Sequence, residues 1–280
     1  MSKFALCVGV NEFEHLPRNN WLNGCVNDAE DCASLLAARY GFPDKSVTLL
    51  TDAAATKDAV IGELTTAVER AKLGELDHLV FTFSSHGTQV PDAEGDDEES
   101  DRADEAFATY DMRQAGDHWD RNTLIVDDEL HDLFAQVPSG VLLDVILDTC
   151  HSGSGLRSID LLLTRQPKFV PPPTVAGLEH VESADPRAFR DLVKNSSVDG
   201  GPVLFAACRS DQTAADARFG DRYNGAFTYF FLQALADHDH LSRADVLKKV
   251  RRNLSAERFP QRAQLEGPAK SLEAPWGSLA

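Results

Sequence analysis

The chain has 280 residues, of which 42% are hydrophobic, and its formal net charge at pH 7 is -18. This size allows one large α/β domain or two small ones with a full hydrophobic core. The negative charge argues against nucleic acid as a partner, because phosphates would be repelled, and it favours cationic partners such as metal ions or basic polypeptides. Alternatively, the acidity only keeps the protein in solution.

Short apolar runs alternate with helical patterns along the chain. Strands are predicted at residues 4–10, 46–50, 78–85, 141–148 and 202–208, and helices at residues 26–41, 56–74, 128–137, 225–237 and 242–254. This alternation is typical of a mostly parallel sheet that helices cover on both faces. An acidic stretch at 91–107 and a stretch at 156–200, typical of a long loop, interrupt the pattern.

The cysteines and the hydropathy pattern predict a soluble, cytoplasmic protein. The five cysteines are irregularly spaced, which argues against a disulfide framework and favours reduced thiols. No apolar run reaches the roughly 18 residues of a membrane span, and no cleavage-site pattern follows the N-terminal apolar stretch. We therefore expect no membrane association.

Polar side chains follow the third and fourth predicted strands. The third strand leads into Ser84, Ser85, His86 and Gly87, and the fourth into Asp148, Thr149, Cys150 and His151. If these strands are neighbours, His86 and Cys150 emerge at the same edge of the sheet. An imidazole there can take the thiol proton and later protonate a leaving amine. The backbone amides of Gly87 and Cys150 are candidate donors to a developing oxyanion.

Two other interpretations of Cys150 are possible. A lone cysteine at a strand end is often a buried small hydrophobe, which is how we interpret Cys7, Cys32 and Cys208. A zinc site of His86, Cys150 and His151 is the second alternative. The adjacent Cys-His side chains would diverge, and the chain has no paired Cys-x-x-Cys motif, so we interpret His151 as positional.

The segments SSHGTQ (84–89) and DTCHSGSG (148–155) resemble the histidine and cysteine motifs of metacaspases, in the bacterial form called orthocaspases. Further segments resemble this family in the same order, over nearly all of residues 3–255: LNGCVNDAEDCASLL (22–36), GDDEESDRADE (95–105), IVDDEL (125–130) and LFAACRSDQTAADA (204–217). The resemblance implies a caspase-like three-layer αβα sandwich with a mostly parallel central sheet. It also implies a cysteine endopeptidase with His86 as general base and Cys150 as nucleophile.

The resemblance further implies one peptidase domain over residues 1–255. Its large-subunit-like part would cover about 1–155, a linker loop about 156–200 and its small-subunit-like part about 201–255, followed by a C-terminal extension at 256–280. In the family, this linker is often cut by the enzyme itself. The candidate cut sites are Arg157, Arg165, Lys168, Arg187, Arg190 and Lys194. Alternatively, the stretch is a surface insertion that is never cleaved.

Cleavage after Arg or Lys is also implied by the resemblance, whereas animal caspases cut after Asp. Asp148 lies two residues before Cys150, so both side chains fall on the same side of the strand. Asp28 matches a second acidic residue of the family's S1 pocket, which holds the side chain before the cleaved bond, with Cys25 and Ser84 as neighbours. Two carboxylates bind a guanidinium and repel an Asp side chain. Asp28 is alternatively a helix N-cap, which is compatible with this role.

Calcium is the activator that the resemblance implies. Asp104, Asp127 and Asp128 match the family's calcium aspartates by motif position, and calcium prefers six to eight oxygen ligands. The family has a further aspartate where this chain has Arg157. Asp160, or one of Asp96, Asp97 and Asp101, would have to complete the shell. Alternatively, the acidic stretch is a solvated loop without a metal.

Our main hypothesis is a monomeric, calcium-activated cysteine endopeptidase that needs no organic cofactor and acts on polypeptides with Arg or Lys at the cleavage site. Asp211 and Asp216 are expected to border its substrate groove. One alternative is a catalytically silent caspase-fold scaffold or a module that binds calcium or a basic partner. The other is an Asp-specific caspase, which would need a basic pocket, but no Lys or Arg lies between Leu22 and Glu30.

Overall fold

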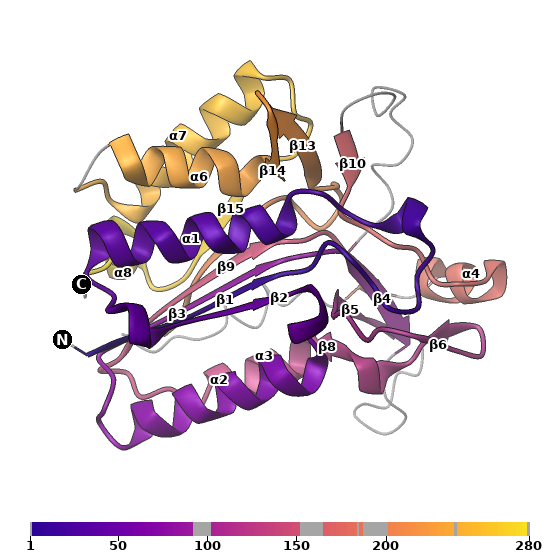
Figure 1. The fold of residues 1–280 in the computed structure, drawn as a ribbon, viewed down its shortest axis with the longest axis horizontal. Coiled ribbons are helices and arrows are strands. Elements are labelled where there is room, and N and C mark those ends of the chain that lie inside the picture. The colour runs from indigo at the N-terminus through magenta and orange to yellow at the C-terminus, as the bar shows by residue number, and fades with distance from the viewer. Residues whose placement is uncertain are drawn as a thin grey trace.

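A six-stranded sheet with the strand order β15-β12-β9-β3-β1-β2 forms the centre of the protein (Figure 1). The computed structural model describes residues 2–91, 102–151, 165–183, 185–186, 201–237 and 240–278. The strands are β1 (Lys3–Gly9), β2 (Val47–Thr51), β3 (His78–Ser84), β9 (Leu142–Asp148), β12 (Val203–Ala206) and β15 (Gln264–Glu266). All neighbouring strands are parallel except β15, which runs antiparallel to β12. The predicted α/β class with a mostly parallel sheet is confirmed.

Helices cover both faces of this sheet and give the three layers seen in Figure 1. The helices on one face are α1 (Cys25–Tyr40), α6 (Ala226–Asp237), α7 (Arg243–Ala256) and α8 (Ala269–Glu273), and those on the other are α2 (Lys57–Lys72) and α3 (Asp127–Phe134). The alternation along β1 explains this arrangement, since Leu6 and Val8 pack in the core on the α2 side while Ala5 and Cys7 pack in the core on the α1 side.

Smaller sheets surround the carboxyl end of the central sheet. One contains β4 (Gly87–Pro91), β5 (Arg102–Ala108), β8 (Leu124–Val126) and β11 (Asp185–Pro186). Another contains β10 (Arg165–Pro167), β13 (Ala215–Phe219) and β14 (Arg222–Gly225). A two-stranded ribbon, β6 (Gln114–Ala115) with β7 (His118–Trp119), and the helix α4 (Val175–Ser183) complete the described elements.

Several expectations from the sequence need correction. The stretches 91–107 and 156–200 were not expected to pack, yet β5 pairs with β4 and β8, and β10 pairs with β13. The sequence gives no local strand pattern here, because β10 has only three residues and pairs with a strand about 50 residues further along the chain. Helix α1 begins at Cys25 with Gly24 as its N-cap, so Asp28 lies in the first turn and is not the cap. The central sheet also continues past residue 255 through β15.

A buried ion-pair network fixes α7 against the middle of the sheet. The Arg243 guanidinium lies 2.7 Å from Asp144 Oδ1, and His78 Nε2 lies 3.0 Å from Asp144 Oδ2. All three side chains are fully buried. Burial opposes the charged form of Asp144, but Arg243 and His78 together hold its pKa below the usual value. The network therefore anchors the helix that precedes the C-terminal segment.

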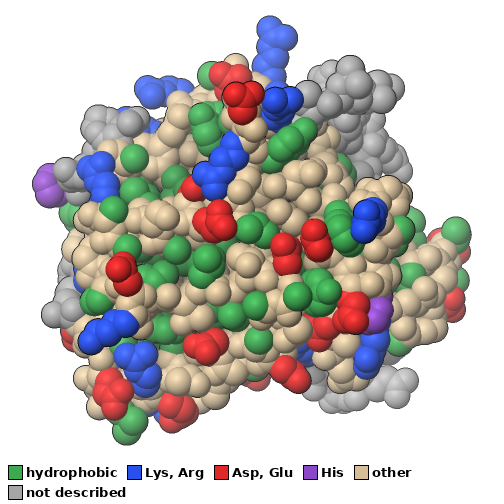
Figure 2. Space-filling view, viewed as in Figure 1, with side chains coloured by type: hydrophobic (Ala, Val, Ile, Leu, Met, Phe, Trp, Pro, Cys, Tyr) green, Lys and Arg blue, Asp and Glu red, His purple; other side chains and the backbone are tan. Residues whose placement is uncertain are grey.

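On the face shown in Figure 2, acidic and basic side chains are scattered among each other, and the acidic ones are not gathered in one area. The charge of this face is thus spread over several elements. Among the described helices, none has both the length and the apolar character needed to cross a bilayer. All five cysteines are buried free thiols.

Candidate active site

His86 and Cys150 lie at the same edge of the sheet. Ser84 and Asp148 are paired across β3 and β9, so His86 and Cys150 each lie two residues beyond a matched pair. Gly87, directly after His86, packs against the backbone of Cys150, because a Cβ atom at position 87 would collide with the carbonyl group of Cys150. Glycine at position 87 therefore allows the two motifs to approach each other.

The hydrogen bonding of His86 defines its tautomer. Its Nε2 atom lies 2.7 Å from the carbonyl oxygen of Asn20, which can only accept, so Nε2 carries the proton. Nδ1 then holds the lone pair, and it is buried without a hydrogen bond to any described residue. Burial lowers the pKa of His86 to about 4, although the bond to Asn20 opposes this, and Lys168 lowers it further. The imidazole is a neutral base at pH 7.

The Cys150 thiol is buried and donates to the carbonyl oxygen of Gln212 at 2.6 Å. Gln212 is held by the C-terminal segment, since its Oε1 accepts from the Arg262 amide at 2.8 Å and its Nε2 donates to the Pro260 carbonyl at 3.0 Å. A donated hydrogen bond requires a protonated thiol. The structure thus shows a resting thiol.

His151 is positioned by its neighbours. Its Nδ1 lies 3.2 Å from the Ala106 carbonyl oxygen, its Nε2 lies 3.2 Å from Thr149 Oγ1, and its ring meets Phe107 edge-on at 4.6 Å. Within the described ranges, the group of side chains close enough to hold a metal ion contains none of His86, Cys150 and His151. The geometry gives no support to the zinc alternative.

The predicted S1 residues Asp28, Ser84 and Asp148 form a buried cluster with Gly225, which was not predicted; we call this cluster the acidic pocket. Ser84 Oγ donates to Asp28 Oδ2 at 2.7 Å, and the Gly225 amide donates to both Asp28 oxygens at 3.0 and 2.9 Å. Thr228 holds Asp148 Oδ2 through its amide and hydroxyl, at 3.0 and 2.7 Å. Burial, more than the charges around it, raises the pKa of the adjacent Cys25 thiol well above its usual value.

The side chain of Lys168 occupies this acidic pocket. Its Nζ atom lies 3.1 Å from Asp28 Oδ2 and 3.2 Å from Asp148 Oδ1, and it donates to Ser84 Oγ at 2.8 Å. Lys168 is fully buried. Burial opposes its charge, but Asp148, Asp28 and Asp216 hold its pKa well above the usual value. Burial raises the pKa of Asp28 to about 7, with Lys168 lowering and Asp148 raising it.

The backbone around Lys168 lies as an extended strand between two parts of the chain. Gln166 pairs with Asp216 and Pro167 with Ala215 in antiparallel register, and the Lys168 amide donates to the Ala214 carbonyl at 2.9 Å. On the other side, the Gly87 amide donates to the Lys168 carbonyl oxygen at 2.9 Å. The carbonyl of a pocket-bound lysine thus rests on an amide that directly follows His86.

The comparison with protein families identifies the family of this chain, because the model described as "Metacaspase, peptidase C14 domain" matches residues 3–159. The chain belongs to the metacaspase family. Metacaspases of the C14 group are cysteine endopeptidases. Metacaspase-1A of Aspergillus oryzae is 30% identical over 98% of this chain and 68% of its own length, and Metacaspase-1 of Cryptococcus neoformans is 27% identical over 94% and 62%.

Solved structures show the same fold. Protein GSU0716 from Geobacter sulfurreducens is 25% identical, with a TM-score of 0.67 over 100% of this chain and 99% of that one. The Drosophila initiator caspase Dronc is 12% identical, with a TM-score of 0.57 over 98% of this chain and 81% of that one. The caspase-like sandwich expected from the sequence is confirmed. This metacaspase chain spans 68% and 62% of the two curated relatives.

Three residues of the pocket were missed in the sequence of this metacaspase. A Cβ atom on Gly225 would collide with Asp148, Asp28 and Lys168 Nζ, so the pocket exists because position 225 has no side chain. Thr228 orients Asp148, and Asn224 Nδ2 donates to Asp28 Oδ1 at 3.0 Å. The only signal in the sequence is a glycine as the first residue of the helix predicted at 225–237. Asp216, expected near the groove, acts electrostatically on Lys168.

The three aspartates matched to the family's calcium site come together. Oxygens of Asp104, Asp127 and Asp128 lie within 4.8 Å of one another. Both carboxylate oxygens of Asp127 are buried without a well-aligned hydrogen bond to any described residue. Burial, with Glu105 and the other two aspartates, raises its pKa to about 9, although the adjacent Asp128 amide opposes this. Asp104 pairs with Arg121 at 2.6 Å. Hard carboxylate oxygens and an unsatisfied buried carboxylate fit a calcium ion. The further shell candidates Asp96, Asp97, Asp101 and Asp160, and Arg157, lie outside the described residues.

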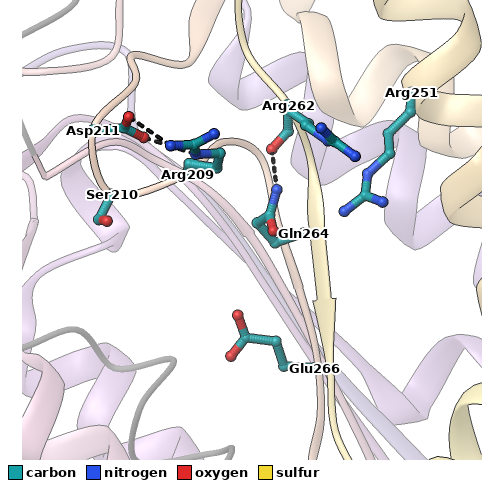
Figure 3. Close-up of a pocket in the computed structure, with 7 residues that line it drawn as sticks. All are labelled: Arg209, Ser210, Asp211, Arg251, Arg262, Gln264 and Glu266. Carbon is teal, nitrogen blue, oxygen red and sulfur yellow. Dashed lines mark hydrogen bonds and ion pairs between the residues drawn. The ribbon is translucent and has the colours of Figure 1, made fainter.

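A second hollow of about 640 Å³ lies beside the edge strand β15, and Figure 3 shows its lining: Arg209, Ser210, Asp211, Arg251, Arg262, Gln264 and Glu266. Asp211, expected at the substrate groove, lines this hollow and pairs with Arg209 at 2.8 Å. The hollow includes no residue of the acidic pocket. Its arginines are partly balanced by Asp211 and Glu266.

Proposed function

We propose that the chain hydrolyses peptide bonds after Lys or Arg, with Cys150 as nucleophile and His86 as general base. The observation that carries this proposal is Lys168, whose side chain fills the acidic pocket while its carbonyl oxygen accepts from the Gly87 amide. A peptide bond held in this way has its reacting carbonyl beside both motifs. The acidic pocket is then the S1 pocket.

The chemistry follows from the donors and acceptors of the site. His86 Nδ1 takes the proton of the Cys150 thiol, and the thiolate attacks the carbonyl carbon. The oxyanion is stabilised by the Gly87 amide, with the Cys150 amide as second donor. The His86 imidazolium then gives its proton to the leaving amine, which leaves a thioester. Water, deprotonated by His86, hydrolyses the thioester and restores the thiol.

The acidic pocket favours a cationic side chain at the cleavage position. Two buried carboxylates attract a lysine ammonium or an arginine guanidinium, and they would repel the carboxylate of an Asp substrate. The acidic pocket is also preorganised, because Ser84, Gly225 and Thr228 hold the two carboxylates in place through hydrogen bonds. These contacts argue against the Asp-specific alternative.

The same arrangement makes Lys168–Phe169 the proposed site of self-cleavage. Of the six candidate cut sites, Lys168 occupies the pocket and Arg165 binds elsewhere. Arg157, Arg187, Arg190 and Lys194 lie outside the described residues. While the chain is uncut, its own strand fills the groove. Cutting after Lys168 would release that strand and admit other polypeptides.

Calcium is the proposed activator, held by Asp104, Asp127 and Asp128. When bound, it would neutralise three clustered carboxylates. Asp127 supports this assignment most directly, because a buried carboxylate without a hydrogen bond is otherwise costly.

The test compares wild type with Cys150→Ala, with calcium and with chelator. We expect wild type to release peptides that end at Lys168, identified by mass spectrometry, and to hydrolyse reporter peptides with Lys or Arg but not Asp at the cleavage position. Lys168→Arg should keep the cut and Lys168→Glu should abolish it. Equal hydrolysis by wild type and Cys150→Ala would overturn the proposal, and no hydrolysis by either protein would favour the silent scaffold.

A further inference from the structure

The side chain of Arg165, three residues before Lys168, is bound by the segment that follows α7. Its guanidinium donates to the carbonyl oxygen of Glu257 at 2.8 Å and to that of Arg258 at 3.0 Å. It also lies over the ring of Phe259, 4.0 Å from the ring centre. We call these three residues, Glu257, Arg258 and Phe259, the 257–259 site.

The backbone of this site is shaped by the end of α7. Arg258 has a φ of 58°, in the left-handed region, and the amides of Arg258 and Phe259 donate back to the carbonyls of Ser255 and Leu254. This is a helix-ending turn that usually has glycine in the left-handed position. The two carbonyls beyond the helix extend the negative end of its dipole. The site therefore presents acceptors and an aromatic face, which together suit a cation.

The site is held in place independently of Arg165. Phe259 is buried, and its ring packs with those of Phe219 and Phe230, at 6.0 and 6.3 Å between ring centres. Gln261 joins the same segment to β13, the strand that pairs with Arg165–Pro167. Its Oε1 accepts from the Ala215 amide at 2.9 Å, and its Nε2 donates to the Ala207 carbonyl at 3.0 Å. The spacing between the 257–259 site and the acidic pocket is therefore fixed by the fold.

We propose that the 257–259 site is a second specificity subsite, which selects a basic side chain three residues before the lysine whose peptide bond is cleaved. Arg165 pairs with Ala217 and Lys168 bonds to Ala214, so one extended strand places a cation in each site. The substrates of this chain are then polypeptides with two basic residues separated by two others, as in Arg-x-x-Lys. The inference rests on the proposed function, because it takes residues 165–168 as bound substrate.

The activity test uses reporter peptides that differ only at the upstream position. After self-cleavage with calcium, wild type should hydrolyse Arg-Gln-Pro-Lys-coumarin with a kcat/KM about tenfold or more above that of Ala-Gln-Pro-Lys-coumarin, since a cation–π contact and two charge-assisted hydrogen bonds are lost with Ala. Phe259→Leu should reduce this ratio severalfold. The matched control is Phe230→Leu, which changes the same aromatic cluster, whereas the cation–π contact of Arg165 is to Phe259, and it should keep the ratio.

A second measurement does not depend on activity. In a Cys150→Ala background, Arg165→Ala and Phe259→Leu are made singly and together, and the urea midpoint of unfolding is measured. If the two side chains bind each other, the double variant should shift the midpoint by clearly less than the sum of the single shifts. The Arg165→Ala and Phe230→Leu pair should be additive.

The outcomes separate the two proposals. Equal kcat/KM for the Arg and Ala peptides, with Cys150→Ala inactive, would overturn the subsite and leave the peptidase intact. If wild type hydrolyses neither peptide, the proposed function fails and the unfolding measurement decides the binding contact alone. Additive midpoint shifts for Arg165→Ala and Phe259→Leu would then overturn the 257–259 site as well.

Discussion

The contact between Lys168 and Asp148 gives the sharpest test of the pocket in solution. The perturbation is Lys168→Ala and Asp148→Asn, singly and together, in a Cys150→Ala background so that the chain stays uncut. Nζ and Oδ1 are 3.2 Å apart, and the two side chains are 0% and 1% exposed. Asn at position 148 keeps an oxygen for the two hydrogen bonds from Thr228, so the exchange removes charge with little change of shape.

The expected coupling follows from the geometry. Two unit charges at this separation attract each other by about 5 kcal/mol when the effective dielectric constant is about 20. Part of this is offset, because Asp28 remains as a second partner for Lys168 and can itself take a proton at its pKa of about 7. We therefore expect each single variant to lose about 3 kcal/mol of unfolding free energy and the pair to couple by about 2 kcal/mol.

The measurement is urea unfolding of the four proteins at pH 8, where Asp28 is mostly charged. As a control, the same cycle on Lys248 and Asp245, which pair at 2.9 Å on the exposed surface of α7, should show little coupling. A Lys168–Asp148 coupling below about 0.5 kcal/mol would place Lys168 outside the pocket in solution and refute the reasoning.

Three further predictions test other parts of the site. Gly225→Ala puts a methyl group against Lys168 Nζ, so self-cleavage at Lys168 should slow by more than about tenfold in a gel time course. The control Gly62→Ala, which has open space around it, should leave the rate unchanged. The kcat/KM for Lys peptides should fall as the pH drops through the pKa of Asp28, because protonation of Asp28 removes the charge that attracts lysine, and Asp28→Asn should flatten this limb. In the uncut chain burial raises this pKa to about 7 although Lys168 lowers it, so in the cut enzyme, whose pocket no longer holds Lys168, the limb should lie at or above pH 7. The pKa of His86, about 4 in the uncut chain, lies well below it. Calcium should raise the melting temperature of wild type and speed self-cleavage, and chelator should reverse both effects. Asp127→Asn should remove the calcium-dependent rise in melting temperature, whereas Asp132→Asn, exposed on the same helix, should keep it. An unchanged melting temperature in wild type with calcium would contradict the metal assignment.

The central sheet could be predicted because its inner strands are buried on both faces. Every residue of β3 and β9 is buried, so each strand is mostly apolar, interrupted only by a few buried polar residues such as Thr82 and Asp144, and the polar residues after it mark the active edge. The sequence does not reveal β10 or β15. Each has only three residues, all partly exposed, and each is held by a partner strand far along the chain.

The site could be predicted only where a local motif carries its residues. His86, Cys150, Asp28 and Asp148 follow strands or belong to short motifs, and the structure brings them to one edge. No local pattern indicates that Lys168 fills the pocket, since six basic residues of the 156–200 stretch were equal candidates. The C-terminal segment was set outside the peptidase domain, yet the Arg262 amide supports the loop that accepts the Cys150 hydrogen bond.

The strand β5 links the aspartate cluster to both catalytic motifs. It contains Asp104, and its Ala108 amide donates to the His86 carbonyl at 3.0 Å, while its Ala106 carbonyl lies 3.2 Å from His151 Nδ1. The Arg121 guanidinium holds Asp104 at 2.6 Å. A cation that replaced Arg121 at Asp104 would therefore act on the strand that supports both motifs. In the resting arrangement the Cys150 thiol donates to the Gln212 carbonyl, and His86 Nδ1 accepts no hydrogen bond from a described residue, so proton transfer to His86 requires the thiol to turn from one acceptor to the other.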